Sequence, residues 1–235
     1  MNRLLLLAAN DFRMVFRDAM LRGFFLLPLL ILVLVVWGVP PLLDAYPAVR
    51  DYKHVILMGA CMQTVTMFGF ITGFVFLEEK DQGVFAALRV LPVTAGTMLS
   101  VRLLLGTAVA WSIGTAIILL TGWLDLHAGA ALLLSLPFAL LTPLLTLLPA
   151  TFARNKVEGL AHFKVWSFLC NLPLLVYFLD HPWLRVLAVI PTYWPYRAVA
   201  AAEAGESIYP SVGVGLLVLA LGLGVMLRIF GRRTF

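Results

Sequence analysis

Six long apolar runs, separated by short polar segments, constrain the fold of this chain more than any other feature. A helix needs roughly 20 apolar residues to cross the hydrocarbon core of a bilayer. Each run is about this long, so the pattern predicts an all-α integral membrane protein with six transmembrane helices. We expect the spans at residues 23–43, 55–77, 98–120, 128–150, 160–179 and 209–227.

The composition excludes the class of soluble globular proteins. Of the 235 residues, 62% are hydrophobic and 12% are charged, whereas soluble domains average about 45–50% and about 25%. The mean hydropathy is +1.00, and so few polar side chains are not enough to cover a fold of this size. We expect a single transmembrane domain over residues 1–235 and no additional catalytic domain.

The first 22 residues predict an amphipathic helix in the membrane interface rather than a span. Leu5, Phe12 and Phe16 recur at helical spacing, whereas Arg13 and Arg17 lie on a different face. Such a helix buries its apolar side at the lipid boundary and keeps its basic side in water. We therefore expect residues 1–22 to precede the first span as an interfacial helix.

The basic residues indicate the orientation of the chain in the membrane. Six spans place both termini on one side, and all but four of the 17 Lys and Arg residues fall on that side. The exceptions are Arg50, Lys53, Arg185 and Arg197. Lys and Arg mark cytoplasmic segments, which predicts a multi-pass protein of the plasma or inner membrane with cytoplasmic N- and C-termini. We expect the side chains of Arg102 and Lys164 to extend to this interface.

Several chemistries are excluded by the residue types present. An ATP-binding phosphate loop ends in Gly-Lys-Ser/Thr, but the four lysines follow Tyr52, Glu79, Asn155 and Phe163. The four histidines are scattered over different segments, so they predict no zinc site. We expect a chain that is not an enzyme and that binds no cofactor or metal. Its basic residues are expected to contact membrane lipid and no nucleic acid.

The segment between spans 2 and 3 is the most specific feature of the chain. Three acidic residues end the second apolar run, namely Glu78, Glu79 and Asp81. We expect them at the N-terminus of a short helix over residues 82–91, where the helix dipole favours negative charge. Gly83 separates this helix from the span, and Pro92 ends it. Its apolar stripe consists of Val84, Phe85, Leu88 and Leu91, with Arg89 beside it.

A second polar segment lies between spans 4 and 5, with the sequence FARNKVEGLAHFKV over residues 152–165. This segment resembles the second cytoplasmic turn of the drug-export (fluoroquinolone-type) permeases. Residues 78–92 resemble the acidic–Lys–acidic, x-Gly, amphipathic helix and x-Pro pattern of ATP-binding-cassette (ABC) permeases of the type-2 export class. The interfacial helix, the six spans and the long aromatic segment before the last span also resemble that class.

This resemblance implies one half of a transporter. Two permease subunits, identical or paralogous, would form the pathway, and two copies of a separate ABC ATPase subunit would bind ATP and Mg²⁺. Residues 82–91 would be the coupling helix that contacts the ATPase, and residues 1–22 the elbow helix. The candidate ATPase contacts are Glu79, Asp81, Gly83, Phe85, Leu88, Arg89, Leu91 and Pro92. The second cytoplasmic turn contributes Asn155, Lys156, Glu158 and Gly159.

Residues 180–208, between spans 5 and 6, are rich in proline and aromatic residues. Aromatic residues are enriched at membrane–water interfaces, so we expect this segment on the extracytoplasmic side. The resemblance implies a re-entrant helical hairpin here, and an ordinary anchored loop is the alternative.

Small and polar residues within the spans predict helix contacts or a pathway. Gly69 and Gly73 form a small-xxx-small face, which favours packing within the chain over a dimer seam. Four polar residues either line a pathway between subunits or bond to a neighbouring helix, because an unsatisfied polar group is costly at this depth. They are Gln63, Thr64, Thr66 and Asn171.

The leading interpretation is a permease subunit of an ABC exporter for an amphipathic or hydrophobic substrate, such as a drug, an antibiotic or a lipid-like molecule. No acidic residue or histidine lies mid-span, so a proton- or ion-coupled antiporter lacks its usual relay. The alternative is a non-transporting membrane scaffold that recruits a soluble partner through residues 82–91. Binding of an ATPase distinguishes the two.

Overall fold

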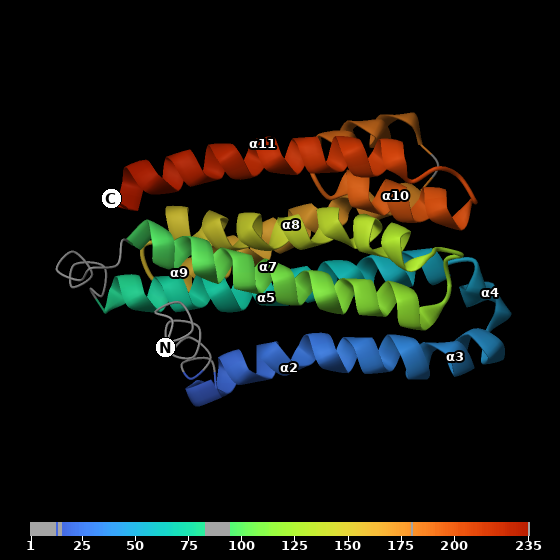
Figure 1. Cartoon of the computed structure of the whole chain (residues 1–235), viewed down its shortest axis with the longest axis horizontal. Helices are drawn as coiled ribbons and strands as arrows, with labels where there is room; N and C mark the ends of the chain where they lie inside the picture. Colours follow the sequence, from blue (N-terminus) through green and yellow to red (C-terminus); the bar gives the residue numbers. More distant parts are fainter. Residues whose placement is uncertain (1–12, 14–15, 83–94, 180, 235) are drawn as a thin grey trace.

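The computed structural model describes residue 13 and residues 16–82, 95–179 and 181–234, and every regular element in this part of the chain is a helix. Within these described residues, six helical segments are long and apolar enough to cross a membrane. Figure 1 shows the long helices running side by side along one elongated bundle. The predicted all-α fold with six transmembrane helices is confirmed.

The six spans follow the apolar runs of the sequence. The first span combines α2 (Ala19–Val33), the π-helical turn η1 (Leu34–Gly38) and α3 (Val39–Ala45). The others are α5 (Lys53–Asp81), α7 (Ala95–Thr121), α8 (Ala128–Phe152), α9 (Lys156–Asn171) with its 3₁₀ extension η2 (Leu172–Tyr177), and α11 (Tyr209–Thr234). The short helix α4 (Pro47–Arg50) connects the first two spans.

The first span passes through Pro40 and Pro41 without ending. Proline cannot donate a backbone hydrogen bond, and its ring clashes with a carbonyl of the preceding turn. The wider π turn η1 lies directly before these residues and gives the backbone room for the proline rings. The helix therefore continues to Ala45.

The second span differs from the prediction at its end. Helix α5 extends to Asp81, so Glu78, Glu79 and Asp81 lie in its last turn. The prediction that they begin a new helix is therefore wrong. Negative charge is unfavourable at a helix C-terminus, and it is tolerated here because cations of neighbouring helices pair with Glu78 and Glu79 and a backbone amide of α9 donates to Asp81.

Helices α5 and α8 form the centre of the bundle. Most residues of both helices are buried, whereas only a minority of residues in each of the other spans is buried. Helices α2 and α7 pack on α5, α7 and α11 pack on α8, and α9 packs on both central helices. The two helices that contact most of the other spans are therefore also the most buried ones.

Two glycines allow the central helices to approach each other. A Cβ atom on Gly69 would lie 2.8 Å from the Cβ atom of Leu145, and one on Gly73 would lie 3.3 Å from the carbonyl oxygen of Thr146. The hydroxyl of Thr146 also donates a hydrogen bond to the carbonyl of Gly69 (3.3 Å). The prediction that this small-residue face serves packing within the chain is confirmed.

Two short helices connect the last two spans, η3 (Pro182–Val189) and α10 (Tyr193–Glu203). The chain reverses between them, and there the hydroxyl of Thr192 donates to the carbonyl of Cys170 at the end of α9 (2.7 Å). Helix α10 packs against α5, α8 and α11, and Figure 1 shows it beside one end of α11. Helix α10 is therefore packed into the bundle, whereas most residues of η3 are exposed.

Two predicted helices fall mainly outside the described residues. Of the predicted coupling helix over residues 82–91, only Gln82 is described, as a turn after α5. Of the predicted interfacial helix over residues 1–22, the described part includes the start of α2, where the carboxylate of Asp18 accepts a hydrogen bond from the amide of Leu21 (3.2 Å). Both helices stay predictions.

We expect Gly69→Ala to destabilise the bundle, because the new methyl group would collide with Leu145. Overpacking of this kind costs about 1–3 kcal/mol, so the Tm of the purified protein in detergent should fall. Gly59→Ala on the same helix is the matched control, since a Cβ atom there meets no atom within 4 Å. Equal Tm values for the two variants would contradict the close α5–α8 contact.

Candidate functional site

One end of the bundle carries a cluster of charged residues, which we name the polar end cluster. It consists of Glu78, Glu79, Lys80 and Asp81 from α5, Arg102 from α7, and Lys156 and Glu158 from α9. In Figure 1 it lies at the end that carries the chain's C-terminus. The cluster unites the two polar segments of the sequence, whose bonded residues are 73 and 75 positions apart.

Three contacts fasten the last turn of α5 to the turn between α8 and α9. The ammonium group of Lys80 donates to the carbonyl of Ala153 (2.9 Å). The ammonium group of Lys156 lies 3.2 Å from the carboxylate of Glu78. The backbone amide of Lys156 donates to the carboxylate of Asp81 (3.4 Å). These two segments therefore form one unit at the end of the bundle.

The predicted second-turn residues shape the start of α9. Asn155 caps the helix by accepting a hydrogen bond from the amide of Glu158 (2.9 Å). The carboxylate of Glu158 in turn accepts from the amide of Arg154 (2.9 Å), much as in a capping box. Gly159 is buried against Leu77, whose side chain would overlap any Cβ atom placed there. These residues seat α9 directly on α5.

Glu79 and Arg102 form a buried ion pair between α5 and α7. Both side chains are only 5% exposed. The guanidinium donates from Nη2 to Oε1 of Glu79 (2.6 Å) and from Nη1 to Oε2, and it lies over the ring of Phe76, 5.3 Å from the ring centre. Two charge-assisted hydrogen bonds offset part of the cost of burying these charges.

This ion pair corrects one prediction. Arg102 turns inward to Glu79 and does not extend to the interface as predicted, because a buried carboxylate offers it a stronger partner than water-exposed lipid. Lys164 is exposed. Glu79, a candidate ATPase contact, is occupied by Arg102 within the chain, whereas Asp81 is exposed at the end of α5. The remaining candidate contacts, Gly83, Phe85, Leu88, Arg89, Leu91 and Pro92, lie outside the described residues.

The four polar residues within the spans are placed in two ways. Thr64 and Thr66 are buried in α5, and their hydroxyls donate to backbone carbonyls one turn earlier (3.0 and 2.7 Å). The side-chain amide of Asn171 likewise donates to a carbonyl of α9 (2.7 Å). Gln63 is exposed midway along α5. That these residues line a pathway stays a prediction.

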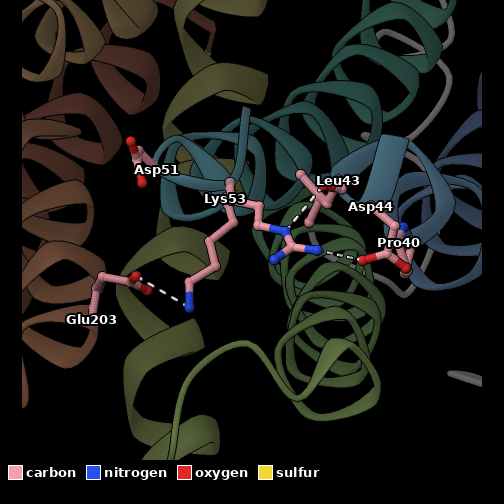
Figure 2. A pocket seen from close by; sticks show the side chains of 7 residues that line it. Pro40, Leu43, Asp44, Asp51, Lys53 and Glu203 are labelled. Atoms are coloured by element: carbon pink, nitrogen blue, oxygen red, sulfur yellow. Dashed lines mark hydrogen bonds and ion pairs between the residues drawn. The ribbon is translucent and has the colours of Figure 1, made fainter. Parts of the chain in front are cut away.

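The opposite end of α5 is also held by charge, beside a pocket of about 370 Å³. Figure 2 shows Lys53 and Glu203 facing each other across it, and their ion pair (3.2 Å) joins the start of α5 to the end of α10. Arg50 donates to the carbonyl of Leu43 (3.0 Å) and to the carboxylate of Asp44 (2.8 Å). These contacts fix the connection between the first two spans.

An apolar cavity of about 550 Å³ lies between α8, α9 and α11. Leu144 of α8, Trp166 of α9 and Val225 of α11 line it, and Ile190 and Pro191, at the reversal between η3 and α10, line one side. Helices α9 and α11 both pack on α8, and the cavity is the space that remains between these two spans.

Sequence reasoning missed the Glu79–Arg102 pair and the apolar cavity. The ion pair left a signal, because opposite charges stand at the end of the second apolar run and just inside the start of the third. Antiparallel neighbouring spans bring such positions to the same depth. The cavity left no signal, because its lining residues have the same composition as any lipid-facing surface.

Comparison with known proteins gives one consistent result. The model of the family described as "Fluoroquinolones export permease protein Rv2686c-like" matches residues 11–227. The fluoroquinolones export permease proteins MT2760 and Rv2686c, from Mycobacterium tuberculosis strains CDC 1551 / Oshkosh and ATCC 25618 / H37Rv, are each 26% identical to this chain. Each alignment covers 94% of this chain and 91% of the relative. No solved structure matches the chain.

We expect Glu79→Gln to be strongly destabilising, because it removes the buried carboxylate that accepts two charge-assisted hydrogen bonds from the guanidinium of Arg102; loss of one buried partner costs about 3–5 kcal/mol. Thermal unfolding in detergent measures this loss. The double variant Glu79→Gln/Arg102→Gln should lose less than the sum of the single variants.

The control for this variant is Asp44→Asn, which breaks the exposed Arg50–Asp44 pair. An exposed ion pair contributes about 1 kcal/mol or less, so its Tm should change little. Equal losses from Glu79→Gln and Asp44→Asn would show that the buried pair is not a structural anchor.

Proposed function

The chain belongs to the family of Rv2686c-like fluoroquinolones export permeases, and we propose that it is the membrane-spanning subunit of an ABC exporter powered by a separate ATPase. Membership makes it a multi-pass membrane permease of a drug-export system. The polar end cluster is the observation that supports the ATPase-driven mechanism. It connects α5, which precedes residues 83–94, with α7, which follows them, and with α9.

The cluster supports a mechanical connection between residues 83–94 and the spans within the membrane. These residues leave α5 after Gln82 and enter α7 at Ala95. The Glu79–Arg102 pair holds α5 to α7 beside them, and Lys156 holds α5 to the start of α9. A partner that displaces residues 83–94 would move three spans together. Such a partner can favour one state of the permease over another only through contacts that differ between the states.

ATP hydrolysis would take place on the partner subunit. The chain contains no Gly-Lys-Ser/Thr sequence of the kind that ends a phosphate loop. We propose two copies of an ABC ATPase, which would hold the ATP and Mg²⁺ and bind the permease through residues 82–91. Glu79 would act indirectly, by positioning α7 through Arg102.

We propose that the polar end cluster and both termini face the cytoplasm of a plasma or inner membrane. The arginines at the end of α11, Arg228, Arg232 and Arg233, belong to the same end of the bundle as the cluster. The opposite end carries fewer basic residues, namely Arg50, Lys53, Arg185 and Arg197. The larger number of Lys and Arg residues at one end supports a cytoplasmic location for that end.

Gln63 supports the presence of a second permease subunit, identical or paralogous. Its side chain is exposed, although α5 is the most buried span. An exposed amide in the hydrocarbon layer is unfavourable. We therefore propose that this face of α5 meets the second subunit or the pathway between the subunits, and that an amphipathic or hydrophobic drug passes there.

We also propose that η3 and α10 form a re-entrant hairpin on the extracytoplasmic side. Pro191, at the reversal, lines the same cavity as Leu221 of α11. Leu221 lies twelve residues after Tyr209, the first residue of α11, which corresponds to about 18 Å along a helix. A reversal at this depth, about halfway along the span, supports a hairpin over an anchored surface loop.

We expect Leu88→Asp to abolish transport and weaken ATPase binding while the permease stays folded. Burial of a leucine in a partner's groove is worth about 1.5–3 kcal/mol, and a carboxylate there would add a desolvation cost. Co-purification of the ATPase and drug efflux from cells measure the two effects. Arg89→Ala, beside the apolar stripe, is the control and should lose less.

Two results would contradict this assignment. Normal ATPase binding and transport by Leu88→Asp would show that the stripe faces lipid. A wild-type complex that binds a soluble partner without moving any drug would favour the non-transporting scaffold.

A charge exchange tests the role of the polar end cluster. Lys156→Glu places a carboxylate against Glu78 and should reduce drug efflux at equal membrane abundance. The double variant Glu78→Lys/Lys156→Glu restores an ion pair of opposite direction, so we expect most of the efflux to return. A double variant as impaired as Lys156→Glu would show that the pair does not join α5 to α9 during transport.

A further inference from the structure

The apolar cavity between α8, α9 and α11 is open toward the lipid. Leu144 and Leu145 of α8 are buried at its base, whereas Leu221 and Val225 of α11 are exposed at its rim. Among the described residues, no charged side chain lines it. A space with this lining is suited to a hydrocarbon chain and gives a zwitterionic or strongly polar molecule no counter-charge.

Two arginines stand on the same face of α11 at the end of the bundle. Val225 and Met226 line the cavity, and Arg232 and Arg233 follow each of them by seven residues, or two helical turns. The guanidinium of Arg233 lies 4.9 Å from the ring centre of Phe152, at the end of α8. In the part of the chain that the structure describes, neither arginine pairs with a carboxylate.

The distance between these arginines and the cavity matches one leaflet. Gly222, next to Leu221, the lining residue of α11 farthest from the arginines, lies ten residues before Arg232, which is about 15 Å along a helix. Half of the hydrocarbon core of a bilayer is also about 15 Å thick. We propose that the cavity binds an acyl chain of an anionic phospholipid, and that Arg232 and Arg233 hold the headgroup of this lipid.

The lipid would fill the gap between two spans that both pack on α8. It would therefore belong to the structure of the single permease subunit. Under the proposed orientation it would come from the cytoplasmic leaflet, which is rich in anionic lipids. The inference rests on membrane insertion and not on transport, so a test with the permease alone is independent of the ATPase and of the substrate.

The test uses the full-length chain in nanodiscs that contain phosphatidylglycerol with a photoactivatable diazirine in its acyl chain. After irradiation, mass spectrometry of peptides should locate cross-links at residues 141–148 and 221–226. Gly222→Leu should reduce them several-fold, because its side chain would grow into the cavity; a Cβ atom there lies 3.8 Å from Leu144, at ordinary contact distance. Gly224→Leu is the matched control, since a Cβ atom there meets no atom within 4 Å.

A second comparison tests the headgroup. The double variant Arg232→Gln/Arg233→Gln should lose several-fold more labelling by the phosphatidylglycerol probe than by a phosphatidylcholine probe with the same diazirine chain. Arg185→Gln, at the opposite end of the bundle, should change neither. Tm values show that each variant is folded.

Three outcomes would overturn the proposal. The first is equal labelling of Gly222→Leu and Gly224→Leu. The second is an equal loss of both probes in the arginine double variant. The third is displacement of the lipid probe by a fluoroquinolone, which would assign the cavity to the drug pathway.

Discussion

The close contact between α5 and α8 is the constraint on which the other helices depend. Lipid tails are as apolar as the side chains of the spans, so the hydrophobic effect cannot hold helices together within a bilayer and dense packing must do so. Gly69 and Gly73 bring the two backbones together. Gly106 of α7 continues this packing, because a Cβ atom there would lie 3.2 Å from the hydroxyl of Thr72 on α5. The central pair then offers two well-packed surfaces to α2, α7, α9 and α11.

Charge fixes what packing alone leaves free, namely the relative positions of the helix ends. Lys53 pairs with Glu203 at one end of α5, and at the other end Glu78 pairs with Lys156 and Glu79 with Arg102. These contacts are directional, so they define how far each helix can slide or rotate against α5. The buried Glu79–Arg102 pair is the most demanding of them, since neither charge can turn to water without opening the α5–α7 contact.

This arrangement connects the small polar end of the bundle to several spans of the membrane domain. The segment over residues 83–94 connects two helices that are already tied to each other, and one of them is tied to a third. Under the proposed function, a displacement at this end would therefore act on several spans at once. The apolar cavity lies between α9 and α11 on the surface of α8. An acyl chain in this cavity would let the two spans move relative to each other without exposing backbone to lipid.

Sequence patterns predicted the elements of this fold well and their contacts poorly. The six spans follow directly from hydropathy, because the thickness of the bilayer sets a length that each apolar run must meet. The packing role of Gly69 also follows from a local pattern. Glu78, Glu79 and Asp81 were assigned to the wrong helix, because the helix-dipole argument considered only the charges of one segment and not the cations of neighbouring helices. The prediction that Arg102 extends to the interface is also wrong, because it considered the position of Arg102 in its own span and not a carboxylate on the neighbouring span.

The sequence by itself determined the membrane class, the number of spans and the positions of the two polar segments, since these depend on local composition and spacing. Only the tertiary structure decided that the two polar segments meet and that Glu79 is buried with Arg102 from the next span. It also decided that a cavity remains between α9 and α11. The physical reason is that each of these features is a relation between helices far apart in the chain. Hydropathy gives the depth of a residue in the membrane, whereas its neighbours are chosen by packing and by pairing of charges across the bundle.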